Sequence, residues 1–230
     1  LLDLGTVCMS VLPVHHSFEC THGITMMIQS GITICISDSL RHFMENLQLF
    51  QPDMIFLVPL FVEMMHRKIW QNAQAAGQAE ALRALLEKSN AELAQGADRR
   101  AEYFKNIHDA FGGKLKLIIC GGAPLSGRLM REFREFGILL LNGYGITECA
   151  PLVSVNKNRF YCDGSVGVPI ACCDVEIRNA DADGDGEIWV KGPNVMLGYY
   201  KNEAGTREVM QDGWFNTGDI GRLDGRGFLH

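Results

Sequence analysis

Short apolar runs alternate with segments of helical period through the first part of the chain. Each run is too short for a helix and lacks a 3.6-residue period, which is typical of a buried strand. The runs occupy positions 7–13, 32–36, 54–58, 114–120 and 137–141. Because strands that alternate with helices favour parallel pairing, we expect an α/β fold with a mainly parallel sheet and flanking helices.

A long helical stretch interrupts this alternation. Positions 61–111 are rich in Ala, Gln and Glu, and leucines at 82, 85 and 86 lie on one face of a helix. We interpret the stretch as a surface helical insertion rather than a partner-binding coiled coil.

The composition changes after about residue 157. Asp-Gly pairs and many glycines separate short β runs, a pattern of hairpins. We therefore predict an α/β subdomain over 1–157 and a small β-rich subdomain, a distorted barrel, over 158–230. The run 181–187 imitates a calcium-binding EF-hand loop, but its twelfth position is Gly192, so a hairpin turn is the better interpretation.

Composition limits the class of protein. The 230 residues are 47% hydrophobic and 21% charged, and the formal net charge of −6 provides no basic field for nucleic acid or an anionic membrane. No apolar run reaches the roughly 18 residues of a membrane span. The eight cysteines lie mostly in apolar runs without the spacing of a disulfide framework, which favours reduced thiols in a cytoplasmic protein.

The stretch 142–148 contains several residue types that suit a nucleotide-binding site. Gly143 and Gly145 allow a ligand to lie against the main chain, and Tyr144 offers a flat face for a purine. Thr147 offers a hydroxyl to a phosphate, and Glu148 a carboxylate to a hard cation such as magnesium. By itself this motif also fits a tight strand-to-helix turn with an exposed acid.

A second glycine turn follows the strand at 114–120. It begins with Gly121 and Gly122, and Ser126 is placed to cap the next helix. Two such turns at neighbouring strand ends would form a crevice for a planar ligand.

Histidines cluster near the N-terminus. His15, His16, Cys20 and His22 lack the ligand spacing of a zinc site. On a helix, consecutive histidines would point about 100° apart. We predict a polar pocket edge at a helix start, without zinc.

Three motifs occur together in a fixed order. They are Gly-Gly-Ala-Pro-Leu-Ser at 121–126, Asn-Gly-Tyr-Gly-Ile-Thr-Glu at 142–148 and Trp-Phe-Asn-Thr-Gly-Asp at 214–219. The last two are separated by Gly-Glu-Ile-Trp-Val-Lys-Gly at 186–192 and Gly-Tyr-Tyr-Lys-Asn at 198–202. From about residue 12 onward the chain resembles the adenylate-forming superfamily of acyl-CoA synthetases, luciferases and peptide-synthetase adenylation domains. The segments 12–19 and 111–115 are most similar to bacterial long-chain fatty-acid–CoA ligases.

This resemblance implies the large N-terminal domain of an acyl-CoA synthetase and a role for each motif. Residues that would line the adenine and acyl pockets or hold the adenine are Gly121, Gly122, Ala123, Gly143, Tyr144 and Gly145. Thr147 would bind the α-phosphate, Glu148 a magnesium ion, and Asp219 the ribose hydroxyls. His16 would lie beside the acyl carboxylate.

The resemblance also implies the reaction: a fatty acid or other carboxylate reacts with ATP to give acyl-AMP, and coenzyme A then displaces AMP. A phosphate loop is expected before residue 1 and a lid with the adenylation lysine after residue 230. We therefore expect the central fragment of a ligase, inactive by itself, with peripheral membrane contact left open for the full-length protein. Alternatives are a non-catalytic module that binds AMP or ATP, a degenerate scaffold for protein contact, and a ligase whose acceptor is a carrier-protein thiol.

Overall fold

In the computed structural model, which describes residues 5–230, the apolar runs of the first part pair as parallel strands. In sheet order they are β2 (Thr33–Ile36), β1 (Val7–Ser10), β3 (Met54–Leu57) and β4 (Leu117–Cys120). Every residue of β3 is buried, as expected for a parallel strand covered on both faces. The predicted parallel α/β sheet is therefore confirmed.

Helices connect these strands. Their bounds are α1 (Met26–Gln29), α2 (Phe43–Phe50), α3 (Pro59–Ala75), α4 (Ala79–Ala94), α5 (Arg100–Tyr103), α6 (Lys105–Ala110) and α7 (Gly127–Glu135), with a π-helical segment at Glu19–Thr25 and a 3₁₀ turn at Leu40–His42. Ser126 caps α7 as predicted, because its side chain accepts a hydrogen bond from the backbone N–H of Arg128 at 3.2 Å. Within residues 5–230, no helix is both long and apolar enough to cross a membrane.

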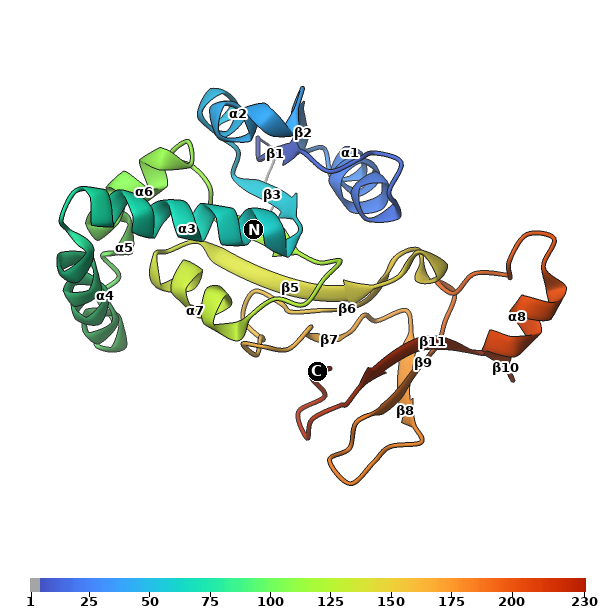
Figure 1. Cartoon of the computed structure of the whole chain (residues 1–230). Coiled ribbons are helices and arrows are strands. Elements are labelled where there is room, and N and C mark those ends of the chain that lie inside the picture. Colours follow the sequence, from blue (N-terminus) through green and yellow to red (C-terminus); the bar gives the residue numbers. More distant parts are fainter. Residues whose placement is uncertain (1–4) are drawn as a thin grey trace. The chain divides into compact units, whose positions relative to one another are not determined.

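The predicted helical insertion consists of α3 to α6 (Figure 1). Val62, Met65 and Ile69 recur on one face of α3 and are buried there. This face belongs to a core cluster that also contains Phe133 and Phe136, at the end of α7. Helix α7 packs against both α3 and α4, so the insertion is anchored by its apolar side.

Strand β5 (Leu139–Gly145) follows β4 in the sheet order. Its C-terminal residues pair antiparallel with β6 (Leu152–Val155), which pairs antiparallel with β7 (Val168–Pro169). In the described residues the strand order is β2-β1-β3-β4-β5-β6-β7. The chain divides within β5 into two compact units, Leu1–Leu141 and Asn142–His230.

The predicted subdomains, 1–157 and 158–230, remain predictions. The first begins with residues 1–4, which lie outside the described part of the chain.

The second unit contains a curled antiparallel half-barrel, in agreement with the predicted β-rich part. Its strands are, in sheet order, β10 (Met210–Gln211), β11 (Trp214–Gly221), β9 (Gly186–Lys191) and β8 (Asp174–Arg178), and α8 (Glu203–Val209) precedes β10 (Figure 1). Asp181 closes the β8–β9 hairpin, because its Oδ1 accepts from the backbone N–H of Asp183 at 2.8 Å and of Asp185 at 3.1 Å. The predicted hairpin turn at this point is confirmed.

Candidate nucleotide site

The glycines at 143 and 145 lie in a strand and not in the turn that the sequence predicts. Strand β5 runs through both, and neither has a positive φ. A Cβ at Gly145 would lie 1.9 Å from the carbonyl oxygen of Pro151, and one at Gly143 would lie 3.1 Å from that of Ser154. These glycines are therefore needed because the backbone of the neighbouring segment approaches closely.

Tyr144, between these glycines, contacts a residue far along the chain. Its hydroxyl donates a hydrogen bond to Oδ2 of Asp219 at 2.6 Å. Burial raises the pKa of the Tyr144 phenol, and the hydrogen bond to Asp219 raises it further. Tyr144 is therefore a protonated donor at neutral pH. The second unit thus brings together two residues of the predicted site that lie in different motifs.

A bulge in β11 places Asp219. The pairing of β11 with β9 shifts between Asn216 and Ile220, and Gly218 within the bulge has a φ of +79°. The hydroxyl of Thr217 donates to the carbonyl of Ile188 at 2.9 Å and accepts from the backbone N–H of Asp219 at 3.1 Å. Asp219 is therefore exposed, while hydrogen bonds through Thr217 hold its backbone in place.

Glu148 follows β5 on a 3₁₀ turn, Thr147–Cys149. Its Oε1 accepts a hydrogen bond from the hydroxyl of Tyr199 at 2.9 Å, and its carbonyl accepts from the backbone N–H of Met196 at 2.7 Å. Thr147, the preceding residue, is exposed, and a carboxylate and a hydroxyl are both oxygen donors of the kind that a hard cation prefers, so the chemistry of these residues fits magnesium. The sequence did not indicate Tyr199 as a site residue. Its only signal was its place in the motif at 198–202.

The remaining predicted site residues belong to the first unit. Gly121, Gly122 and Ala123 follow the carboxyl end of β4, and Gly122 adopts a φ of +84°. His16 is exposed, and its Nδ1 accepts from the backbone N–H of Phe18 at 3.1 Å. That these residues share a crevice with Tyr144 and Asp219 remains a prediction.

The histidine cluster differs in part from the prediction. His15 and His16 lie in a turn before the helical segment, so the helical period does not separate them as predicted. His22 is buried, its Nδ1 lies 3.3 Å from the carbonyl oxygen of Phe18, and burial lowers its pKa. The absence of zinc here remains a prediction.

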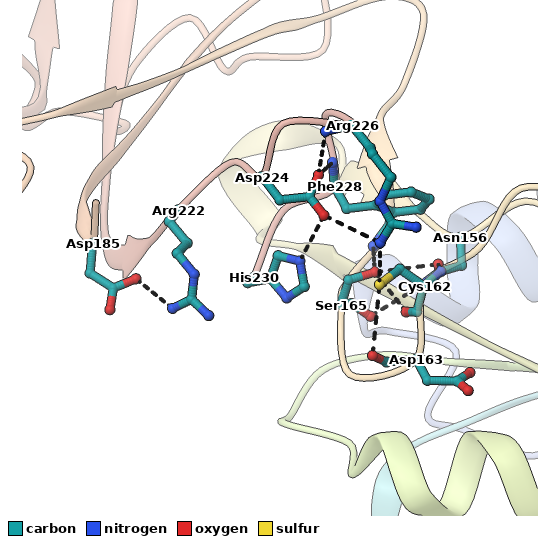
Figure 2. Close-up of polar contacts among 11 residues, drawn as sticks. Asn156, Cys162, Asp163, Ser165, Asp185, Arg222, Asp224, Arg226, Phe228 and His230 are labelled. Atoms are coloured by element: carbon teal, nitrogen blue, oxygen red, sulfur yellow. Dashed lines mark hydrogen bonds and ion pairs between the residues drawn. The ribbon is translucent and has the colours of Figure 1, made fainter. Parts of the chain in front are cut away.

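Another group of possible metal ligands lies in the second unit (Figure 2). Among the described residues, one atom each of Cys162, Asp224 and His230 lie within 4.8 Å of one another. The guanidinium of Arg226 donates to Sγ of Cys162 at 3.0 Å and to Oδ2 of Asp224 at 3.4 Å. Oδ1 of Asp224 accepts backbone N–H groups of Phe228 and Arg226, and these bonds help hold the pKa of Asp224 at about 2. The positive charge of Arg226 thus already offsets the negative charge of Asp224 in this cluster. The cluster closes the loop after β11.

The sequence matches known ligases over most of its length. A family model described as AMP-binding enzyme matches residues 2–200. The long-chain-fatty-acid–CoA ligase FadD15 of Mycobacterium bovis is 30% identical over 244 residues, which cover 100% of this chain and 39% of that protein. Human long-chain-fatty-acid–CoA ligase 1 is 32% identical over 226 residues, which cover 93% of this chain and 32% of that protein. The chain therefore spans less than half the length of these relatives.

Solved structures show the same fold. O-succinylbenzoate–CoA synthetase from Bacillus subtilis, in complex with AMP, matches with a TM-score of 0.69 and 24% identity, over 100% of this chain and 41% of that one. A fatty acyl-CoA synthetase from Mycobacterium tuberculosis matches with a TM-score of 0.71 and 19% identity, over 99% of this chain and 40% of that one. The ordered motifs, the family match and the relatives agree: the chain belongs to the AMP-binding enzyme family.

Proposed function

We propose that the chain is the central part of an ATP-dependent ligase that activates a carboxylate as acyl-AMP and transfers the acyl group to coenzyme A. The observation that carries this proposal is the 2.6 Å hydrogen bond between Tyr144 and Asp219. It joins the motif assigned to adenine with the motif assigned to ribose. Long-chain fatty acids are the proposed carboxylates, because the curated relatives above carry this substrate in their names.

In the second unit, the proposed roles follow from side-chain chemistry. Tyr144, which lies between Gly143 and Gly145 on β5, presents its ring to adenine, because a flat aromatic face can stack on a purine. Asp219 accepts hydrogen bonds from the ribose hydroxyls, because a carboxylate offers two acceptor oxygens to a vicinal diol. Thr147 donates its hydroxyl to the α-phosphate. Glu148 holds magnesium, whose charge would offset the negative charge that grows on the phosphate.

In the first unit, the proposed residues are Gly121, Gly122, Ala123 and His16. The backbone of the glycine turn, which is buried at Gly121 and exposed at Gly122 and Ala123, would line the adenine and acyl pockets. His16 would lie beside the acyl carboxylate. Support for these roles comes from their place in the motifs and from the exposure of Gly122, Ala123 and His16.

The proposed reaction has two displacements. A carboxylate oxygen of the substrate bonds to the α-phosphorus of ATP, and pyrophosphate leaves. The sulfur of coenzyme A then bonds to the acyl carbon, and AMP leaves. The protein contributes by positioning these groups and by balancing charge. We propose that the isolated chain lacks this activity and that the parent protein works in the cytoplasm.

Carboxylate-dependent ATP–pyrophosphate exchange in the full-length parent protein tests the proposal. The panel should contain fatty acids of several lengths and o-succinylbenzoate, since a structural neighbour carries that acid in its name. Exchange that depends on a long-chain fatty acid supports the proposed ligase. ATP binding without exchange for any carboxylate would favour a non-catalytic nucleotide-binding module. Adding coenzyme A or a carrier-protein thiol to the preformed acyl-AMP then identifies the acceptor.

A further inference from the structure

The carboxylate assigned to magnesium is itself held by a tyrosine. The hydroxyl of Tyr199 donates a hydrogen bond to Oε1 of Glu148 at 2.9 Å, across 51 residues of sequence. We propose that Tyr199 is a positioning residue: it fixes the orientation in which Glu148 meets the cation that accompanies the triphosphate. This inference rests on the proposed function, because that function assigns the cation to Glu148.

The backbone of Tyr199 is fixed to the start of α8. Its N–H donates to Oγ1 of Thr206 at 2.9 Å, and that hydroxyl donates to the carbonyl of Asn202 at 2.8 Å. The side chain of Asn202 caps α8 by accepting from the backbone N–H of Gly205 at 3.0 Å. The tyrosine ring therefore extends from a segment that a helix cap holds in place.

The segment before Tyr199 is tied to the segment that carries Glu148. The backbone N–H of Met196 donates to the carbonyl of Glu148 at 2.7 Å. The side-chain amide of Asn194 donates to the carbonyls of Cys149 at 3.3 Å and of Leu152 at 3.0 Å. Because backbone and side chain of Glu148 are both bonded to this segment, the contact with Tyr199 is part of a larger attachment.

The next residue provides a contrast. The ring of Tyr200 is 87% exposed, and its neighbour is the ammonium of Lys201, 5.2 Å from the ring centroid. Tyr199 is 37% exposed, and partial burial followed by the hydrogen bond to Glu148 raises the pKa of its phenol. The two tyrosines thus differ in contacts but share chemistry, so Tyr200→Phe is a matched control for Tyr199→Phe.

Oxygen ligands bind a cation well when neighbouring hydrogen bonds orient them. Tyr199→Phe keeps the ring and removes the donor to Oε1. The carboxylate of Glu148 then has to be ordered by the cation itself, which weakens cation binding. Because a hydrogen bond to a charged group is lost, we expect an effect of about tenfold.

The experiment uses the full-length parent protein and the variants Tyr199→Phe, Tyr200→Phe and Glu148→Gln. Free Mn²⁺, measured by electron paramagnetic resonance with ATP present, gives the cation affinity without catalysis. The Mg²⁺ dependence of pyrophosphate exchange gives the requirement during turnover. We expect Tyr199→Phe to raise the Mn²⁺ dissociation constant and the half-saturating Mg²⁺ concentration by about tenfold. Glu148→Gln should have a larger effect, and Tyr200→Phe should match the wild type.

At saturating Mg²⁺, the exchange rate of Tyr199→Phe should return to within about twofold of the wild type, because the lost interaction acts through cation binding. The inference is overturned if Tyr199→Phe binds Mn²⁺ like Tyr200→Phe, or binds it more tightly, since Tyr199 would then compete with the cation. A wild-type protein without exchange for any carboxylate would contradict the proposed function instead. The Mn²⁺ measurement would still decide the role of Tyr199.

Discussion

At the scale of single residues, Asp219 combines exposure with a well-defined position. Its backbone is held by Thr217 in the bulge of β11, and its Oδ2 accepts from the hydroxyl of Tyr144. A carboxylate presented in this way can accept further hydrogen bonds from a ligand at little cost in conformational entropy. This is why we expect Asp219 to contribute to nucleotide affinity.

Asp219→Ala in the full-length parent should weaken ATP binding by roughly ten- to a hundredfold, because hydrogen bonds to a charged acceptor are lost. Isothermal titration calorimetry with ATP measures this change. Asp183→Ala removes an exposed carboxylate from the β8–β9 hairpin and is the control, with unchanged affinity expected. Equal ATP affinity in Asp219→Ala and Asp183→Ala would exclude Asp219 from the nucleotide site.

A second residue-scale expectation concerns alkaline stability. Burial raises the pKa of the Cys149 thiol from 9.0 to about 12. In the unfolded chain this thiol ionises near its ordinary value, whereas in the folded chain it stays protonated. Its contribution to stability is therefore fully present below about pH 9 and is lost as the pH rises towards 12, by up to about 1.4 kcal/mol per pH unit.

Urea unfolding between about pH 8 and pH 11, under reducing conditions, tests this linkage. Cys149→Ala should show a shallower fall of the unfolding free energy with pH than the wild type. Cys172 is exposed, so Cys172→Ala should keep the wild-type slope. Identical slopes in the wild type and Cys149→Ala would contradict the raised pKa.

At the scale of elements, β5 is the strand on which the candidate site depends, since it carries Tyr144 and leads into Glu148. The apolar residues at its start predict a strand from sequence. Its continuation through Gly145 is not predictable, because glycine pairs usually indicate a turn. Here glycine is required at positions 143 and 145 because the backbone of Ser154 and Pro151 approaches them closely. Local sequence does not encode this approach.

Gly145→Ala should destabilise the chain by roughly 1–3 kcal/mol or more, because the added Cβ would overlap the carbonyl oxygen of Pro151. Gly225→Ala is the matched control: a Cβ there meets nothing within 4 Å, and its φ is not positive. Urea denaturation of both variants measures the difference. If Gly145→Ala were as stable as Gly225→Ala, the described packing of β5 would be wrong.

At the scale of the whole molecule, the sequence predicts the features that depend on local interactions and does not predict contacts between residues far apart in the chain. Strand β3 and the cap at Ser126 were predictable because apolar runs and capping residues act locally. The resemblance to a family assigned Tyr144 and Asp219 to one nucleotide site, but the hydrogen bond between them was not predicted, since 75 residues separate them. The hydrogen bond from Tyr199 to Glu148 was not predicted, because no local pattern encodes contacts between distant loops.

A crystal structure of the full-length parent with AMP bound tests the central claim most directly, namely that this chain holds adenosine at Tyr144 and Asp219. We predict that the adenine ring lies against the face of Tyr144 and that the ribose hydroxyls donate to the carboxylate of Asp219. The phosphate should lie on the side of Thr147 and Glu148. AMP bound elsewhere, with the Tyr144–Asp219 hydrogen bond unchanged and no nucleotide contact to either residue, would contradict the account.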